Sequence, residues 1–97
     1  MIAEFSVVPI GVGESLSTYV AECLKIVEKS GLRYQLTPMG TILEGDFYKV
    51  METIGLCHLR VRSMSRRVTT TIRLDDRETH TDEMSRKVRS VRDKMGD

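Results

Sequence analysis

The side chains that could perform acid–base or metal chemistry are few and scattered along this chain. Asp75 and Asp76 stand side by side and are followed at once by Arg77. Paired carboxylates serve general acid–base catalysis or hold a divalent ion. The same carboxylates can equally cap a loop or pair with Arg77, and we favour this structural interpretation. The pair is therefore only a weak candidate for catalysis.

The two histidines lie apart and in different surroundings. His58 falls near the apolar side of a predicted helix, and His80 falls in a polar loop. Neither belongs to an H-x-x-x-H or H-E-x-x-H pattern, which is the spacing that would place two ligands on one metal ion. We expect His58 at a core or interface position and His80 in solvent. We assign no catalytic residue, no metal site and no cofactor.

The two cysteines, Cys23 and Cys57, both fall on the apolar side of predicted helices. Two isolated cysteines make neither a disulfide framework nor a C-x-x-C redox or metal pair, so we expect buried, reduced side chains. The N-terminal stretch has neither the basic region nor the apolar core of a signal peptide. No apolar run approaches the roughly 20 residues that span a bilayer. These features predict a cytoplasmic protein without a membrane segment.

The densest constellation is the stretch 34–45, where two short strands are predicted on either side of Pro38 and Gly40. The hydroxyls of Thr37 and Thr41 alternate there with apolar side chains. Threonine hydroxyls both donate and accept hydrogen bonds, and apolar neighbours can cover a flat ring. The thioether of Met39 adds a surface that can pack against an aromatic ligand or the loop itself. This stretch is where a small ligand could be held.

The elements that must position these residues follow from the apolar periodicity. Residues 2–10 read as a strand, and the helix after them is predicted to begin at a Ser15 cap and to end at Gly31. The strand pair 33–45 precedes a helix capped by Asp46, a strand over 66–75, and a last helix capped by Asp82. The order β-α-β-β-α-β with a terminal helix predicts an α+β, ferredoxin-like sandwich. One domain spans residues 1–97.

One face of such a sheet is left uncovered by the two helices that pack on the other face. The residues predicted to line this open face are Glu4, Ser6, Val8, Thr37, Thr41, Leu43, Thr69 and Thr71. A face that mixes apolar and hydroxyl side chains is most simply covered by the sheet of a second copy, which predicts a homo-oligomer. The last helix is predicted to turn its own apolar stripe inward, through Met84, Val88, Val91 and Met95.

The formal net charge of +1 gives no general argument for nucleic acid, whose binding proteins carry a marked basic excess. Basic residues do gather in two places. They are Arg60, Arg62, Arg66 and Arg67 in one segment, and Arg86, Lys87, Arg89, Arg92 and Lys94 in the last helix. We interpret both clusters as solvated helix faces, with a nucleic-acid footprint as the less favoured alternative.

Blocks along the whole chain resemble one family. They are Ser6-Val7-Val8-Pro9, Ser17-x-Tyr19-Val20-Ala21, Ser30-Gly31-Leu32-x-Tyr34, Leu36-Thr37-Pro38-Met39-Gly40-Thr41-Ile42-x-Glu44-Gly45, Val68-x-Thr70-Thr71-Ile72-x-Leu74-Asp75-Asp76-Arg77 and Lys87-Val88-x-Ser90-Val91. Together these blocks resemble the MTH1187/YkoF-like family, also called the UPF0045 or thiamine-binding family. The Thr-Pro-Met-Gly-Thr and Asp-Asp-Arg blocks are the more specific ones. One departure is Ser65, which stands where a glycine usually joins the second helix to the last strand.

The resemblance implies a ferredoxin-like domain that dimerises through its sheets and assembles as a dimer of dimers. It also implies that some members bind thiamine or its hydroxymethylpyrimidine portion near subunit boundaries. Carried onto this sequence, the resemblance places Ser6, Val8, Thr37, Met39 and Thr41 at the ligand.

Three functions remain open from the sequence. The leading hypothesis is a non-catalytic oligomer that binds a thiamine-like pyrimidine, in which Glu4 or Glu44 could attract the cationic thiazolium. The second is a structural or regulatory protein whose sheet-mediated oligomer docks other proteins through its arginine-rich helices. The third is an enzyme that uses Asp75, Asp76 or His58, which requires these groups to converge on one cleft.

Overall fold

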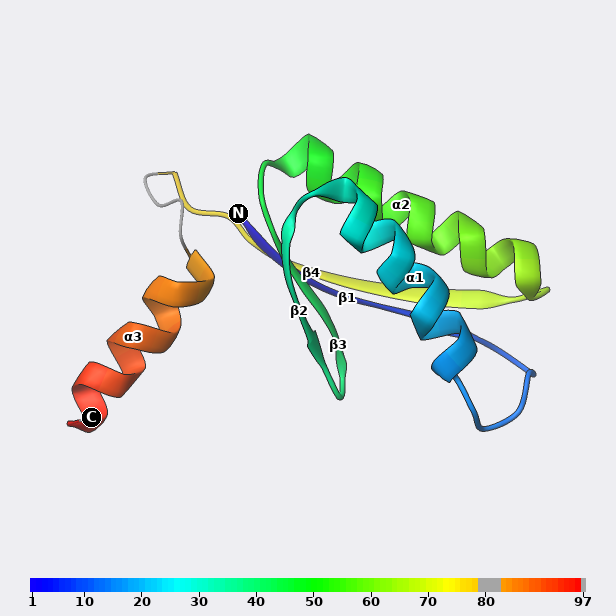
Figure 1. Ribbon diagram of the computed structural model, residues 1–97, viewed down its shortest axis with the longest axis horizontal. Coiled ribbons are helices and arrows are strands. Elements are labelled where there is room, and N and C mark those ends of the chain that lie inside the picture. The colour runs from blue at the N-terminus through cyan, green and yellow to red at the C-terminus, as the bar shows by residue number, and fades with distance from the viewer. Residues whose placement is uncertain (79–82, 97) are drawn as a thin grey trace.

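The computed structural model describes residues 1–78 and 83–96 and shows an antiparallel sheet with two helices packed on one face (Figure 1). The elements are β1 (Ile2–Pro9), α1 (Ser17–Ser30), β2 (Arg33–Thr37), β3 (Gly40–Glu44), α2 (Phe47–Met64), β4 (Val68–Asp75) and α3 (Glu83–Met95). The strands lie in the order β2-β3-β1-β4. This is the predicted α+β, ferredoxin-like arrangement with an additional C-terminal helix.

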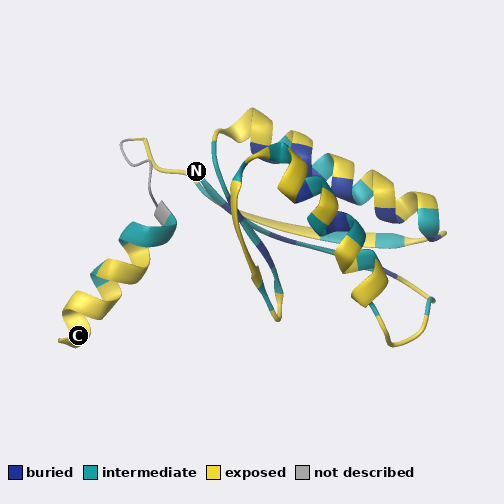
Figure 2. Ribbon diagram, in the orientation of Figure 1, coloured by how far each residue is buried: buried dark blue, intermediate teal, exposed yellow. Residues whose placement is uncertain are grey.

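The hydrophobic core lies between the sheet and the pair α1 and α2, where Figure 2 places the buried residues. Ala3 and Phe5 face it from β1 because alternate strand residues point to the same side. The other members are Cys23, Val27, Leu43, Val50, Ile54, Cys57 and Val61. Phe47, in the first turn of α2, is 45% exposed and lies outside this core. The two cysteines are buried, as the sequence predicted.

Two of the three describable helix-end predictions are confirmed. Gly31 ends α1 in the left-handed conformation, with φ of 76°, and Asp46 caps α2 by accepting a hydrogen bond from the Lys49 N–H at 3.1 Å. The Ser15 prediction is wrong, because Leu16 occupies the N-cap and no side chain caps α1. Leu16 already has helix-like backbone angles, which leaves Ser15 one residue too early. The predicted Asp82 cap lies outside the described residues.

The turn between β2 and β3 corrects the predicted composition of the open face. Thr37 pairs with Gly40 across the two-residue turn 38–39. Because paired residues share a face, Thr37 lies with Gly40, and the next residue, Thr41, points to the helices. Thr41 is only 7% exposed, and Leu43 is fully buried on the same side. The prediction that both line the open face is therefore wrong.

The remaining predicted residues do share the open face. The register places Glu4, Ser6 and Val8 of β1 opposite Arg73, Thr71 and Thr69 of β4, all on the side away from α1 and α2. The turn after α2 also forms without glycine. Ser65 has an extended backbone, with φ of −142°, and its hydroxyl donates to the Arg67 carbonyl at 3.1 Å.

The last helix, α3, lies beside one end of the open face and is attached near its start (Figure 1). The Met84 N–H donates to Glu44 Oε2 at 3.2 Å, and Lys87 pairs with Asp75. The predicted inward stripe is not covered in a single chain. Val88, Val91 and Met95 are 54%, 57% and 70% exposed, respectively. Only the first turns of α3 reach the sheet, so the rest of the stripe meets solvent.

Candidate ligand-binding site

The five residues singled out from the sequence, Ser6, Val8, Thr37, Met39 and Thr41, all line one cavity of about 160 Å³. The β2–β3 hairpin diverges there from the far half of β1, with the start of α1 nearby (Figure 1). The other lining residues are Phe5, Val7, Leu16, Val20, Cys23, Leu36, Pro38 and Gly40. Drug-sized ligands occupy pockets of roughly 300–1,000 Å³, so this cavity suits a single small ring.

The cavity opens beside β1 because β3 is shorter than β1. Phe5 makes the last pair between the two strands, and Met39, which would stand opposite Val7, belongs to the turn. The N–H and C=O of one residue point to the same side of an antiparallel strand, and the side alternates along the chain. The Ile10 N–H binds the Arg67 carbonyl on the β4 side, so odd-numbered residues face β3. Val7 therefore directs its N–H and C=O toward the cavity.

The Thr37 hydroxyl holds the turn together. Its oxygen accepts hydrogen bonds from the N–H groups of Met39 at 3.2 Å and Gly40 at 3.1 Å, and it donates to the Gly40 carbonyl at 2.9 Å. A hydroxyl has one hydrogen to donate and two lone pairs that accept, so these three bonds use the full hydrogen-bonding capacity of the Thr37 hydroxyl. Among the described residues, the hydroxyls of Ser6 and Thr41 have no partner and remain available to a ligand.

Gly40 sets how closely the hairpin approaches β1. A Cβ atom built at Gly40 would lie 2.7 Å from the Phe5 carbonyl oxygen and 3.8 Å from the Ser6 Cβ. The first distance is too short for a carbon–oxygen contact and involves main chain, which cannot swing away. Only glycine allows this approach, and Ser6 and Thr41 then border the cavity from opposite faces of the sheet.

The apolar wall of the cavity was only partly predicted. Leu36 and Val20 line it and are 51% and 37% exposed, while Met39 at the hairpin tip is 84% exposed. Leu16, Val20 and Cys23 follow one another at the spacing of three and four residues that is typical of a core-facing helix stripe. No signal in the sequence distinguishes them from core residues, because their contact with the cavity depends on how α1 packs on the sheet.

Neither carboxylate proposed for the thiazolium reaches this cavity. Glu44 lies 3.5 Å from Arg33 and also accepts the Met84 N–H. Glu4 lies on the open face and lines a separate hollow with Arg73. The prediction that Glu4 or Glu44 supplies attraction is therefore wrong for this cavity. Its described lining contains no charged side chain.

The groups required by the enzyme hypothesis do not converge. The His58 Nδ1 atom lies 2.6 Å from Thr70 Oγ1 on the helix side of the sheet, in a hollow formed by α2 and β4. Asp75 pairs with Lys87 on the open face, and Asp76 is exposed beyond the strand. Thr70 and Asp75 are separated by five strand positions, roughly 17 Å, and face opposite sides. His80 lies outside the described residues.

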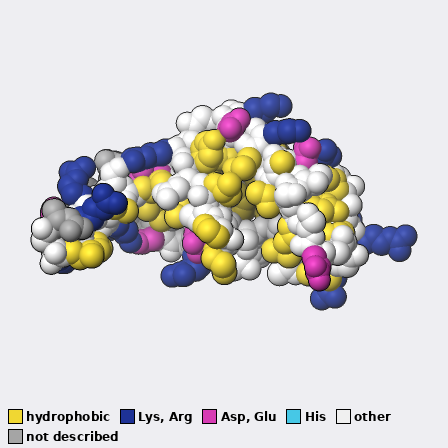
Figure 3. All heavy atoms as spheres, turned by 60° about the horizontal axis from the view of Figure 1, so that its bottom comes forward, with side chains coloured by type: hydrophobic (Ala, Val, Ile, Leu, Met, Phe, Trp, Pro, Cys, Tyr) yellow, Lys and Arg dark blue, Asp and Glu magenta, His cyan; other side chains and the backbone are white. Residues whose placement is uncertain are grey.

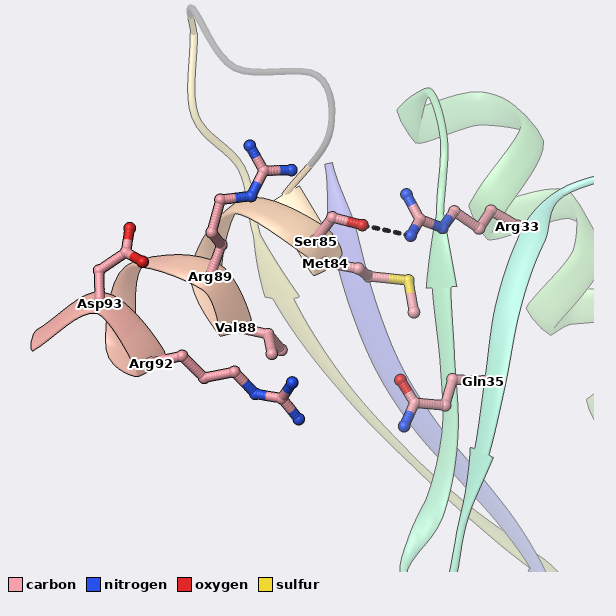
Figure 4. Close-up of a pocket in the computed structure, with 8 residues that line it drawn as sticks. All are labelled: Arg33, Gln35, Met84, Ser85, Val88, Arg89, Arg92 and Asp93. Atoms are coloured by element: carbon pink, nitrogen blue, oxygen red, sulfur yellow. Dashed lines mark hydrogen bonds between the residues drawn. The ribbon is translucent and has the colours of Figure 1, made fainter. Parts of the chain in front are cut away.

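A larger but shallower hollow lies between α3 and the edge strand β2 (Figure 4). Its volume is about 540 Å³, and Arg33, Gln35, Val88, Arg89 and Arg92 contribute to its lining. Figure 4 shows the Arg92 side chain extending toward the gap, whereas Asp93 points away from it. Arg33 instead donates a hydrogen bond to Ser85, which fixes the start of α3. This hollow was not predicted, because it depends on where α3 lies.

Two further observations concern metal ions and membranes. No group of three or more histidine, cysteine, aspartate or glutamate side chains suited to a metal ion occurs in the ranges 1–78 and 83–96. Within the same ranges, no helix combines the length and apolar character needed to cross a membrane.

The sheet, its two covering helices and the small cavity edged by hydroxyls define a ferredoxin-like domain of the small-molecule-binding class. The chain belongs to the thiamine-binding protein family, whose sequence model matches residues 3–92. A UPF0045 protein from Methanothermobacter thermautotrophicus is 38% identical over 96 residues, covering 96% of this chain and 97% of that protein. One from Synechocystis is 36% identical over 92 residues, covering 94% of this chain and 76% of that protein.

The fold comparison agrees with this assignment. The crystal structure of MJ1052 from Methanocaldococcus jannaschii matches with a TM-score of 0.88 and 30% identity, covering 93% of both chains. The sequence-based assignment to the UPF0045 family and to the ferredoxin-like fold is therefore confirmed.

Proposed function

We propose that this chain is a non-catalytic binding protein for a small heteroaromatic ring, with thiamine or its hydroxymethylpyrimidine portion as the ligand. The observation that carries the proposal is the cavity itself. It combines apolar walls, the hydroxyls of Ser6 and Thr41, and the main-chain N–H and C=O of Val7. The description of the family as thiamine-binding supports the choice of ligand.

The polar groups of the cavity complement the edge of an aminopyrimidine. Such a ring has nitrogen acceptors next to an amino donor. The Val7 N–H and C=O offer a donor and an acceptor side by side, which is the pattern that a strand presents to a new partner. The hydroxyls of Ser6 and Thr41 can donate or accept. Val8, Leu36 and the other apolar walls remove the ring faces from water.

The charge distribution favours one orientation of thiamine. Its thiazolium ring is cationic, and burying an unpaired charge is costly. Because the described lining contains no carboxylate, the neutral pyrimidine enters the cavity and the thiazolium stays near the mouth, beside Met39. Hydroxymethylpyrimidine alone is then expected to retain most of the binding free energy of thiamine.

Calorimetry with thiamine and with hydroxymethylpyrimidine tests binding, and amide spectra test the placement. The Val7 N–H should shift and become protected from exchange when ligand is added. The matched control is the Phe5 N–H, which is already paired with β3 and should change little. If neither compound produces heat of binding at millimolar concentration, the proposal is refuted.

Hydroxyl-removing variants test the contacts. Thr41→Val keeps the shape of the side chain and should weaken ligand binding by about threefold to tenfold, the equivalent of one net hydrogen bond. Thr18→Val is the control, because Thr18 is exposed on α1 and does not line the cavity. Equal affinities for both variants would contradict the assigned role of Thr41.

We further propose that the functional unit is a homo-oligomer, a dimer of dimers, in the cytoplasm. The observations are the uncovered face of the sheet and the exposed stripe of α3, and Figure 3 shows several apolar side chains exposed on the face that it presents. Val91→Glu, on that stripe, should reduce the mass measured by light scattering. Arg89→Gln, on the same helix, changes the net charge by the same amount and is the control. A monomeric wild-type protein would refute this assembly.

The exposed stripe also gives the alternative function, a structural or regulatory oligomer that docks other proteins. In that case the protein would bind no pyrimidine, and deletion of residues 82–97 would abolish partner capture. The calorimetric result therefore separates the two functions.

A further inference from the structure

Cys23 and Cys57 lie against each other at the contact between α1 and α2. The Cys57 thiol donates to the Cys23 carbonyl oxygen, with 3.6 Å between sulfur and oxygen. Cys57 is completely buried, whereas Cys23 is 8% exposed and forms part of the cavity wall. Cys23 therefore borders the cavity, whereas Cys57 is not part of its lining.

We propose that Cys23 and Cys57 are a redox-active dithiol, in which Cys23 reacts with a hydroperoxide entering the cavity and Cys57 then closes a disulfide between α1 and α2. Neither the family description nor the binding function assigns a role to these residues. Cytosolic disulfides are usually transient and serve in catalysis or redox sensing, which is the role that this pair fits.

The electrostatics of the pair favour the same order of reaction. The pKa of Cys23 is lowered by its interaction with the Cys57 side chain, which outweighs the opposing effects of burial and of the Glu22 carboxylate. The pKa of Cys57 is raised, first because its hydrogen is committed to Cys23 and second because burial disfavours its charged form. Since the thiolate is the reactive species, Cys23 is the more nucleophilic of the two.

The chemistry balances without a cofactor. The Cys23 thiolate attacks one oxygen of the hydroperoxide, the O–O bond breaks, and the alkoxide leaves and is protonated to an alcohol. Cys23 is then a sulfenic acid. The Cys57 sulfur attacks the Cys23 sulfur, the S–O bond breaks, and hydroxide leaves as water with the Cys57 proton. Two thiols are oxidised by two electrons, and the hydroperoxide is reduced.

The disulfide would alter the cavity directly. It removes the Cys23 thiol from the wall and joins two helices across a separation of 34 residues. Oxidation should therefore raise the midpoint of thermal unfolding, because the cross-link restricts the unfolded chain. This redox step does not depend on the proposed ligand, although the ligand would share the same access route.

The test treats reduced wild-type protein with hydrogen peroxide and follows free thiols in denaturant together with the intact mass. The chain has only two cysteines, so an intramolecular disulfide must join them. We expect loss of both thiols, a mass lower by two hydrogen atoms, and reversal by a phosphine reductant. Oxidation to sulfinic acid without a disulfide, or cross-linking only between chains, would overturn the proposal.

Single variants assign the order of reaction. In Cys57→Ser the reaction should stop at a sulfenic acid on Cys23 that dimedone traps. In Cys23→Ser the Cys57 thiol should remain reduced. If either variant fails to fold, brief alkylation of the wild-type protein gives the same answer, because Cys23 should be labelled before Cys57. Equal labelling of both residues would overturn the assignment.

Addition of hydroxymethylpyrimidine separates this inference from the proposed function. A ligand in the cavity should slow the loss of the Cys23 thiol. If the disulfide forms normally but the ligand has no effect on its rate, the ligand placement fails and the dithiol stands. If the ligand binds but no disulfide forms, the dithiol fails alone.

Discussion

Replacing Gly40 by alanine should force β3 away from β1 and destabilise the protein. The added Cβ atom would lie 2.7 Å from the Phe5 carbonyl oxygen, and the next atom it meets, the Phe5 carbonyl carbon, is 3.4 Å away. Both are main-chain atoms at the centre of the sheet, so no side-chain rotation relieves the contact. Overpacking of this kind costs about 1–3 kcal/mol of the free energy of unfolding.

The change can be measured by urea unfolding at one fixed protomer concentration, because assembly would otherwise shift the apparent stability. For a domain of this size each kcal/mol corresponds to roughly 4–8 °C in the thermal midpoint. The same displacement would widen the cavity between Ser6 and Thr41, so ligand affinity should fall together with stability.

Gly55→Ala is the matched control. Gly55 lies inside α2, and a Cβ atom there meets nothing within 4 Å. Alanine in a helix interior is favoured over glycine by about 0.5–1 kcal/mol, so this variant should be more stable than the wild type. If Gly55→Ala behaves in this way and Gly40→Ala stays within about 0.5 kcal/mol of the wild type, the close approach of the hairpin to β1 is not what fixes the cavity.

Three further predictions follow from local contacts. Thr37→Val should lower the free energy of unfolding by about 0.5–1.5 kcal/mol, because it removes the acceptor of the Met39 and Gly40 N–H groups, which water partly replaces at this exposed turn. Thr37→Ser should keep most of the stability, and urea unfolding compares the two variants. Asp46→Ala should cost about 0.5–2 kcal/mol by removing the cap of α2, and Asp46→Asn should cost little in the same assay. The pKa of Glu22 is held below its ordinary value, first by Lys25 and second by Arg60. The pairing therefore stabilises the folded state at pH values above the ordinary pKa of glutamate. This stabilisation is lost as the pH falls through the lowered pKa of Glu22. Lys25→Met should therefore raise the Glu22 pKa measured by NMR titration, and an unchanged value would contradict the role of Lys25.

The fold could be predicted from the sequence because its signals are local. Gly31 and Asp46 end and begin helices through their own backbone conformation and side-chain chemistry. The alternation of Val68 to Leu74 with polar residues indicates a strand with one covered face. Ser15 was misread because a cap depends on the backbone angles of the next residue, and Leu16 took the cap position.

The site could be predicted as a set of residues but not as a geometry. The stretch 34–45 contributes Thr37, Met39 and Thr41, which line one cavity together with the other two candidates, Ser6 and Val8. The role of Thr37 could not be predicted, because its hydroxyl is engaged in hydrogen bonds within the turn. The length of the same turn places Thr41 on the helix side of the sheet. The role of Val7 could not be predicted from its side chain, because its main-chain N–H and C=O are the groups that face the cavity.

The order of the elements, the family and five of the residues that line the cavity could be recognised from the chain alone, because each depends on neighbours in the sequence. Tertiary packing, in contrast, sets which groups remain without a partner inside the protein. The early end of β3 leaves the main chain of Val7 without a strand partner on that side. The packing of α1 on α2 places Cys57 next to Cys23, and the sheet separates His58 from Asp75. These are contacts between distant segments, and they are set by register and packing rather than by residue type.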